Sequence, residues 1–175
     1  SVGVVTINMP RIAYLATDEA DFYARLDHLM DVSARSLKIK RTIITKLLDE
    51  GLYPYTKRYL GTFNNHFSTI GLIGMNEVGL NAKWLRKDMT NKETQEFAKD
   101  VLNHMRERLS DYQELYGDLY NLEATPAEST TYRFAKHDKK HYPAIITANE
   151  NGTPYYTNSS HLPVGYTADI FEALD

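Results

Sequence analysis

Residues 3–9 read GVVTINM, an apolar run rich in β-branched side chains that Pro10 ends. Residues 67–75, FSTIGLIGM, form a second such run, and residues 120–125, YNLEAT, form a shorter extended segment. Short β-branched runs bounded by Pro, Gly or polar residues are typical of buried strands. We therefore predict three strands, and the apolar residues on both of their faces predict burial on both sides of the sheet.

A long segment with helical periodicity follows the first strand. Thr17 or Asp18 can cap a helix there, and Gly51 can end it. Roughly thirty residues would make a helix of about 45–50 Å, which suggests a large barrel or a helix that projects beyond one. Apolar side chains keep one stripe of this segment, and charges are expected to fill the opposite face.

Further helices are expected between and after the other strands. Thr90 is expected to cap a long helix over residues 92–116, and shorter helices are expected over residues 76–85 and 129–140. Strands that alternate with long helical crossovers predict a parallel α/β sheet with helices outside it. No repeat or linker stands out, so residues 1–175 are treated as a single segment without an internal boundary.

Composition limits the class of protein. A hydrophobic content of 42% and a charged content of 25% are those of a soluble globular chain. The net charge of −3 gives no general attraction for nucleic acid or acidic membranes, and no apolar run is long enough for a membrane span. The absence of cysteine excludes disulfides and fits a cytoplasmic location.

Residues 124–143, ATPAESTTYRFAKHDKKHYP, join the third strand to a helix with basic residues. The start of a helix offers backbone N–H groups without internal partners, and its dipole favours an anion. The run therefore suits a phosphate-binding turn, although an ordinary capped helix start is the alternative. The candidate phosphate-binding residues are Thr125, Pro126, Ala127, Glu128, Ser129, Thr130 and Thr131.

Four runs point together to a family. In chain order they are SVGVVTINMPRIAYLA (1–16), FSTIGLIGMNEVGLNA (67–82), ATPAESTTYRFAK (124–136) and PYYTNSSHLPV (154–164). They resemble the anaerobic (class III) ribonucleoside-triphosphate reductases, glycyl-radical enzymes that reduce ribonucleoside triphosphates to deoxyribonucleoside triphosphates. The resemblance covers nearly the whole chain. It implies an internal fragment of the ten-stranded α/β barrel in the large catalytic subunit.

The same resemblance implies cofactors that this segment lacks. The family uses a cysteine thiyl that attacks the ribose, a glycyl radical installed by an S-adenosylmethionine/iron–sulfur activase, and a structural zinc site. The chain has no cysteine and no run resembling the glycyl-radical loop. The cysteine loop is therefore expected upstream of residue 1 and the glycyl-radical segment downstream of residue 175. No cofactor or metal is expected within the chain, which is expected to be inactive alone.

The resemblance also implies partners for the chain. They are a ribonucleoside triphosphate substrate, the remaining segments of the reductase, the activase, and a second subunit of a homodimer. Nucleic acid and membranes are not expected partners. The base preference, the reductant and the allosteric effectors stay open.

Candidate site residues follow the predicted strands, because sites in parallel α/β barrels form where strands end. Asn8 is the first candidate for a catalytic pocket, with Met9 on the pocket wall. A buried amide can hold a substrate hydroxyl, although Asn8 could instead satisfy loop backbone. Asn76 and Glu77 follow the second strand, and Asn76 is a further pocket candidate.

The last motif and the strand glycines leave alternatives open. Tyr155, Asn158 and His161 are candidate pocket residues. Tyr155 and Tyr156 should point to opposite faces, so at most one faces the barrel interior, and packing is favoured over a radical relay. Gly71 and Gly74 indicate close approach by a ligand or chain segment, or tight packing.

The charged residues and the histidines give weaker evidence of a functional site than the motifs above. Glu128 is expected to be a charge partner of the helix start rather than a pocket carboxylate. The lysines at 136, 139 and 140 form a solvated face or a rim that attracts a triphosphate. The six histidines show no spacing typical of metal ligands.

Two other functions remain. A glycyl-radical enzyme of the formate-lyase type is one, but its substrates carry no phosphate, so the phosphate-binding turn argues against it. The other is a non-catalytic nucleotide- or phosphate-binding module, or a packing scaffold. Nucleotide titration with Ser129→Ala and Thr130→Ala would separate a binding module from a scaffold.

Overall fold

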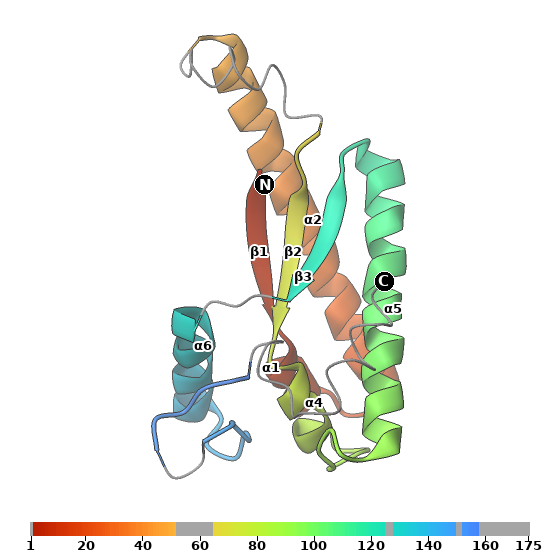
Figure 1. The fold of residues 1–175 in the computed structure, drawn as a ribbon, viewed down its shortest axis with the longest axis vertical. Helices are drawn as coiled ribbons and strands as arrows, with labels where there is room; N and C mark the ends of the chain where they lie inside the picture. Colours follow the sequence, from red (N-terminus) through yellow and green to blue (C-terminus); the bar gives the residue numbers. More distant parts are fainter. Residues whose placement is uncertain (1, 52–64, 125–127, 150–151, 158–175) are drawn as a thin grey trace.

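A parallel three-stranded sheet lies at the centre of the computed structural model, which describes residues 2–51, 65–124, 128–149 and 152–157 (Figure 1). The strands are β1 (Gly3–Asn8), β2 (Ser68–Ile73) and β3 (Tyr120–Ala124), in the spatial order β1-β2-β3. The helices are α1 (Met9–Leu15), α2 (Glu19–Asp49), α4 (Met75–Asn81), α5 (Lys92–Tyr116) and α6 (Glu128–His141). Both strand pairs are parallel, which confirms the predicted parallel α/β arrangement.

The long helix α2 begins and ends close to its predicted bounds. Asp18 is its N-cap and accepts a hydrogen bond from the backbone N–H of Asp21 at 2.8 Å. Its 31 residues correspond to about 47 Å. Its last turns project beyond the amino end of the sheet (Figure 1), as the predicted length suggested.

The surface of α2 differs from the prediction, because it carries two apolar stripes. The buried stripe faces the sheet and includes Phe22, Leu26, Met30, Ala34 and Leu37. A second set is 40–54% exposed and consists of Leu29, Val32, Ile39 and Ile43. The expectation that charges alone fill the opposite face was therefore wrong.

The short helix α1 was not predicted. The first strand ends at Asn8, and Met9 begins a helix with Pro10 in its first turn. Proline suits this position because its fixed φ is helical and its missing N–H is not needed there. Pro10 therefore starts a helix as well as ending a strand.

Two other helix boundaries also differ. The cap of α5 is Asn91, whose side chain accepts from the backbone N–H groups of Glu93 and Thr94. Thr90 instead bonds Asp88, so the predicted cap was off by one residue. The helix after β2 ends at Asn81 rather than near residue 85.

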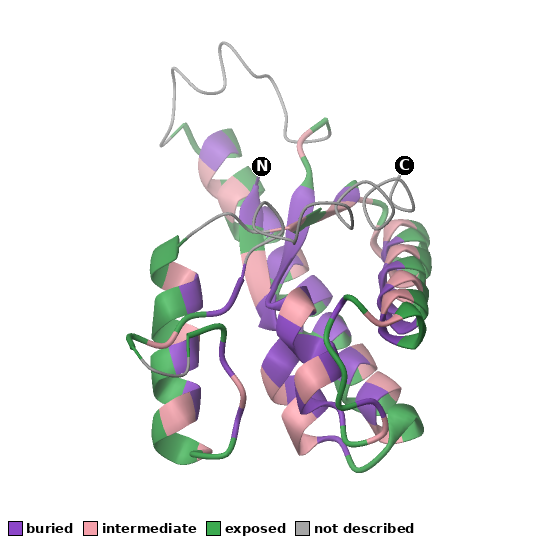
Figure 2. Cartoon of the chain, turned by 60° about the horizontal axis from the view of Figure 1, so that its bottom comes forward, coloured by how far each residue is buried: buried purple, intermediate pink, exposed green. Residues whose placement is uncertain are grey.

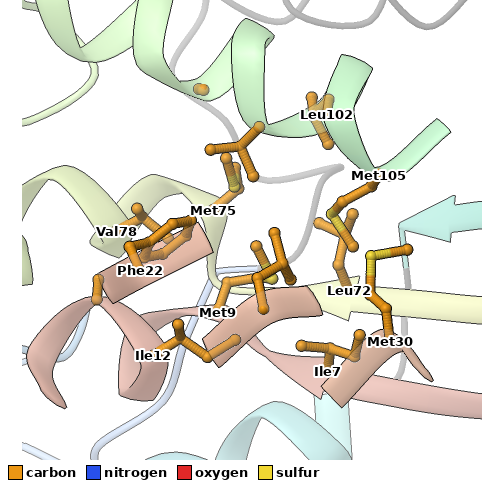
Figure 3. Packing of buried hydrophobic residues seen from close by; sticks show 14 of the residues in the cluster. Ile7, Met9, Ile12, Phe22, Met30, Leu72, Met75, Val78, Leu102 and Met105 are labelled. Carbon is orange, nitrogen blue, oxygen red and sulfur yellow. The ribbon is translucent and has the colours of Figure 1, made fainter. Parts of the chain in front are cut away.

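One face of the sheet packs into the apolar core. Val5, Ile7, Ile70, Leu72 and Leu122 lie on this face, and α2 and α5 cover it. Figure 3 shows Met30 of α2 and Met105 of α5 close to Leu72, with Met9 and Phe22 deeper in the same cluster. Burial of these side chains is the main apolar contribution to the stability of the described fold.

The opposite face carries smaller and more polar side chains. In register it presents Val4, Thr6 and Asn8 from β1, Thr69, Gly71 and Ile73 from β2, and Asn121 and Glu123 from β3. All six residues of β2 are buried, as predicted, and the central strand is buried along its length in Figure 2. By contrast, Val4 is 52% exposed and Glu123 is exposed. Burial on both faces is therefore complete for the central strand only.

No helix among the described residues combines the length and apolar character needed to cross a bilayer.

Candidate functional site

The carboxyl ends of β1 and β2 lead directly into short helices. Asn8 caps α1, and Gly74 precedes α4 with a left-handed φ of 76°. A Cβ at Gly74 would lie 2.3 Å from Cγ of Pro10, so a side chain does not fit there. Gly74 thus marks a close approach between the two strand ends, one of the two expectations for this residue.

The side chain of Asn8 is held on both sides. Its Oδ1 accepts a hydrogen bond from the backbone N–H of Arg11 at 3.1 Å, which caps α1. Its Nδ2 donates to Oδ2 of Asp138 on α6 at 2.8 Å. Asn8 therefore satisfies local backbone, as the simpler interpretation held, and also joins β1 to a helix 130 residues away.

Asp138 is the centre of this contact, and its side chain is fully buried. The Nε of Arg11 donates to Oδ1 at 2.6 Å, and the hydroxyl of Tyr156 donates to Oδ2 at 2.6 Å. Burial and the hydrogen bond to Asp138 raise the pKa of Tyr156 far above its usual value. The phenol therefore stays protonated and remains a donor. We call Asn8, Arg11, Asp138 and Tyr156 the Asp138 joint.

A second buried carboxylate, Glu77 on α4, holds the segment after α6. Its two oxygens accept from the backbone N–H of Thr157 at 2.5 Å and from the Thr157 hydroxyl at 2.6 Å. The backbone N–H of Gly74 donates to the carbonyl of Thr157 at 2.9 Å. Desolvation raises the pKa of Glu77 to about 7, against the opposing effect of the hydrogen bonds from Thr157.

The first turn of α6 contains the described part of the proposed phosphate turn. Glu128 and Ser129 are exposed and Thr130 is half-buried. Thr131 is buried, and its hydroxyl donates to the carbonyl of Glu128 at 2.8 Å, so that proton is already engaged. Thr125, Pro126 and Ala127 lie outside the described residues.

The remaining candidates do not gather around Asn8. Met9 is fully buried in the apolar core, and Asn76 is half-buried in the first turn of α4. Tyr155 is 39% exposed while Tyr156 is buried, which confirms that the two rings point apart. Within the described residues, neither Asn76 nor Tyr155 bonds the Asp138 joint. Asn158 and His161 lie outside the described residues.

A cavity of about 700 Å³ opens beside Asn8, between β1, α2 and α6. Its walls are mainly apolar and include Val5, Ile7, Leu29 and Val32. Asn8 and Arg11 line it as well. Because the groove follows β1 and the exposed stripe of α2, its walls suit another apolar element of protein better than a phosphate. In the described parts of the chain no cluster of His, Asp or Glu is arranged to hold a metal ion.

Sequence reasoning missed both buried carboxylates as site residues. Glu77 was noticed at the strand end, but Asn76 was chosen beside it. Asp138 stands in the run KHDKKH, which reads as a solvated basic face. The available signal was a lone acidic residue within a basic helix. Its partners lie 18 to 130 residues away in the sequence, so no local pattern links them to it.

Comparison with known proteins gives a consistent result. Residues 1–175 match the family model described as anaerobic ribonucleoside-triphosphate reductase. The curated enzyme of that name from Haemophilus influenzae is 30% identical over 190 residues, which cover 100% of this chain and 26% of the relative. The enzyme from Enterobacteria phage T4 is 28% identical over 193 residues, which cover 99% of this chain and 30% of the relative. The chain therefore spans between a quarter and a third of these relatives.

Solved structures agree with the sequence matches. The anaerobic ribonucleotide reductase from Thermotoga maritima with glycerol in the active site has a TM-score of 0.77 and 25% identity, covering 98% of this chain and 28% of that one. The same enzyme in complex with dATP and CTP has a TM-score of 0.75 and 25% identity, again covering 98% and 28%. The described α/β fold thus resembles part of a larger reductase fold.

Proposed function

The chain belongs to the anaerobic ribonucleoside-triphosphate reductase family, and from this premise we propose that it forms one wall of the catalytic barrel of such a reductase. The parallel sheet with outer helices supports this role, as does the match to about a quarter of the length of related enzymes. The reaction would be removal of the ribose 2′-hydroxyl from a ribonucleoside triphosphate by radical chemistry.

The orientation of the Asn8 amide is the observation that carries the proposal. After its bonds to Arg11 and Asp138, the amide keeps one N–H and one oxygen lone pair. Such a group can donate to one ribose oxygen and accept from one ribose hydroxyl. It lies at the carboxyl end of a parallel strand, where α/β barrels place their sites.

The first turn of α6 would bind the triphosphate. Its first backbone N–H groups have no partners within the helix, and the helix dipole favours an anion. Within the described residues the hydroxyls of Ser129 and Thr130 make no hydrogen bond, so both can donate to phosphate oxygens. Glu128 would contribute its backbone N–H, with its exposed carboxylate in solvent. Thr125 and Ala127 would add backbone N–H groups to the turn, and Pro126 and Thr131 would form part of it without donating a backbone N–H to phosphate.

The other candidates would have lesser roles. Met9, which is buried behind Asn8, would support the pocket wall from the core. Asn76, Tyr155, Asn158 and His161 are proposed for the remaining rim of the pocket.

The radical chemistry would require groups from elsewhere in the protein. The chain contains no cysteine, so its residues fit neither a thiyl radical nor a cysteine-rich zinc site. The glycyl radical and a cysteine thiol would supply the hydrogen-atom chemistry, after installation of the radical by an S-adenosylmethionine/iron–sulfur activase. A homodimer in the cytoplasm is the proposed setting. The residues of this chain would bind the nucleotide, orient its ribose and exclude water.

The test is deoxynucleotide formation by the full-length, activated protein with each ribonucleoside triphosphate. We expect Asn8→Ala to lower kcat by about 10- to 100-fold with KM changed less than about threefold, because the amide acts on the ribose. We expect Ser129→Ala with Thr130→Ala to raise KM by about tenfold with kcat nearly unchanged. Ile39→Ala, on the exposed stripe of α2 and outside the cavity beside Asn8, is the control. Wild-type kinetics for both site variants would contradict the proposal.

A further inference from the structure

The Asp138 carboxylate on α6 lies where two other segments of the chain, residues 8–11 and the segment after α6, meet this helix. It accepts hydrogen bonds from Asn8 at the end of β1, from Arg11 of α1, and from Tyr156 in the segment after α6. The carboxylate is fully buried, so water does not substitute for these partners. A buried carboxylate is costly unless it is paired and hydrogen-bonded, and these three donors meet that requirement.

The chemistry of the Asp138 joint permits a single orientation of the Asn8 amide. The oxygen and nitrogen ends of an amide are nearly equal in size, so shape alone does not distinguish them. The backbone N–H of Arg11 only donates, and the Asp138 carboxylate only accepts. A flipped amide would place its N–H₂ against a donor and its oxygen against the carboxylate, and would lose both hydrogen bonds.

We propose that Asp138 is a positioning residue for the substrate: it fixes the Asn8 amide so that one defined N–H and one defined lone pair face the ribose. This inference rests on the proposed function of Asn8. Arg11 balances the buried charge, and Tyr156 donates to the same oxygen as Asn8. Neither residue needs to touch the nucleotide for this role.

The position of Asp138 on α6 adds a second consequence. The proposed phosphate turn lies in the first turn of the same helix, about 14 Å away along its axis at about 1.5 Å per residue. One rigid helix therefore fixes the distance between the proposed phosphate turn and the ribose-binding amide of Asn8. Loss of Asp138 should disturb the ribose end while the phosphate turn stays intact.

A double-mutant cycle in the full-length activated reductase tests the proposal. Asn8→Ala, Asp138→Ser and the double variant are compared by kcat and KM with a ribonucleoside triphosphate. Serine is chosen because its short hydroxyl does not reach Asn8, whereas asparagine would keep an acceptor for the Asn8 amide. We expect each single variant to lower kcat by about 10- to 100-fold with KM within about threefold. The double variant should be no slower than Asn8→Ala, because Asp138 acts through Asn8.

Asp31→Ser is the control for the loss of a carboxylate that an arginine and a tyrosine bond, at a side chain that is 55% exposed. Asp31 on α2 also accepts from an arginine and a tyrosine hydroxyl, Arg108 and Tyr112 of α5, away from the proposed site. The Asp31 variant should keep the kcat and KM of the wild-type enzyme. If Asp138→Ser does not fold, Asp138→Leu takes its place in the cycle, since leucine has a similar size and offers Asn8 no acceptor.

The outcomes distinguish a failure of the proposed role of Asn8 from a failure of the positioning role of Asp138. Wild-type kcat in Asn8→Ala would overturn the proposed role of Asn8 and the positioning role with it. An impaired Asn8→Ala together with an unaffected Asp138→Ser would overturn the positioning role alone. Losses that multiply in the double variant would also overturn it, because Asp138 would then act independently of Asn8. An equal loss in Asp31→Ser would overturn it as well, because the loss would then be a general effect on stability.

Discussion

The two faces of the sheet come from the same three strands but are built differently. The face under α2 and α5 is continuous apolar core, with Ile7, Ile70 and Leu72 in adjacent strands. The opposite face carries Asn8, Thr69 and Asn121, and ends at the Asp138 joint. The difference indicates that the first face supplies most of the folding free energy, which leaves the second available for recognition.

The two faces also differ in how their contacts are made. The apolar face is held by many similar side chains, and the loss of one leaves the others in place. The Asp138 joint depends on a few directional hydrogen bonds between residues far apart in the chain. Substitutions on the apolar face should therefore act on stability, and substitutions at the joint should act on function as well.

The largest effect is expected for Phe22→Ala on the apolar face. Phe22 is fully buried, and its ring lies 5.2 Å from that of Phe97, centroid to centroid. Removal of the ring should lower the free energy of unfolding by about 3–5 kcal/mol, as measured by urea denaturation. Val32→Ala, on the exposed stripe of the same helix, should change it by less than about 0.5 kcal/mol. Equal effects of the two variants would contradict the assignment of the two stripes.

The next largest effect is on how stability depends on pH, and it comes from Glu77 beside the polar end of the sheet. Its pKa is raised to about 7 in the fold from an ordinary value of 4.5. The folded state therefore binds the proton more tightly than the unfolded state. The resulting stability is complete below about pH 4.5 and is lost as the pH rises through about 7.

Glu77→Gln should remove this pH dependence, since glutamine keeps an acceptor for Thr157 and does not titrate. Between pH 5 and 8 the wild-type chain should lose stability relative to the variant, by on the order of 3 kcal/mol. Denaturation midpoints across this range measure the difference. Parallel pH profiles of the two proteins between pH 5 and 8 would show that Glu77 is ionised throughout this range in the fold.

A smaller effect is expected in the middle of the polar face. The hydroxyl of Thr69 donates to Oδ1 of Asn121 at 2.6 Å. Thr69→Val keeps the shape of the side chain and removes this bond, so stability should fall by about 0.5–1.5 kcal/mol. Urea denaturation is again the measurement. A loss as large as that of Phe22→Ala would mean that the polar face contributes to folding as much as the core does.

The smallest effect on stability is expected for Val32→Lys with Ile39→Lys. Both side chains are more than half exposed on α2, so the free energy of unfolding should change by less than about 0.5 kcal/mol. Self-association of the isolated chain should weaken, because exposed apolar stripes favour association. Sedimentation velocity measures this change. An unchanged association state would place the contact on another surface.

Much of the apolar face could be predicted from the sequence, because periodicity is a local signal. The three strands, the long helix α2 and its cap Asp18 follow from residues close together in the chain. The family could also be identified, from four ordered motifs. The helix α1 was missed because Pro10 can both end a strand and start a helix.

The polar end of the sheet was harder to predict. Asn8 was predicted as a site residue from its place at the end of a strand, and this stays a prediction, whereas Asp138 was not considered. A buried carboxylate is revealed by its partners, and those of Asp138 come from two segments, residues 8–11 and Tyr156, that meet it only in the folded chain. Helical spacing places Asp138 on a basic helix and does not show which side faces the sheet.

The central claim is that the nucleotide meets the sheet at the Asn8 end of its polar face and at the start of α6. Hydrogen-exchange mass spectrometry of the full-length protein, with and without a ribonucleoside triphosphate, tests this claim most directly. We predict slower exchange at residues 8–11 and 128–131, with α2 and α5 unchanged. Protection confined to α2 or α5, with residues 8–11 and 128–131 unaffected, would contradict it.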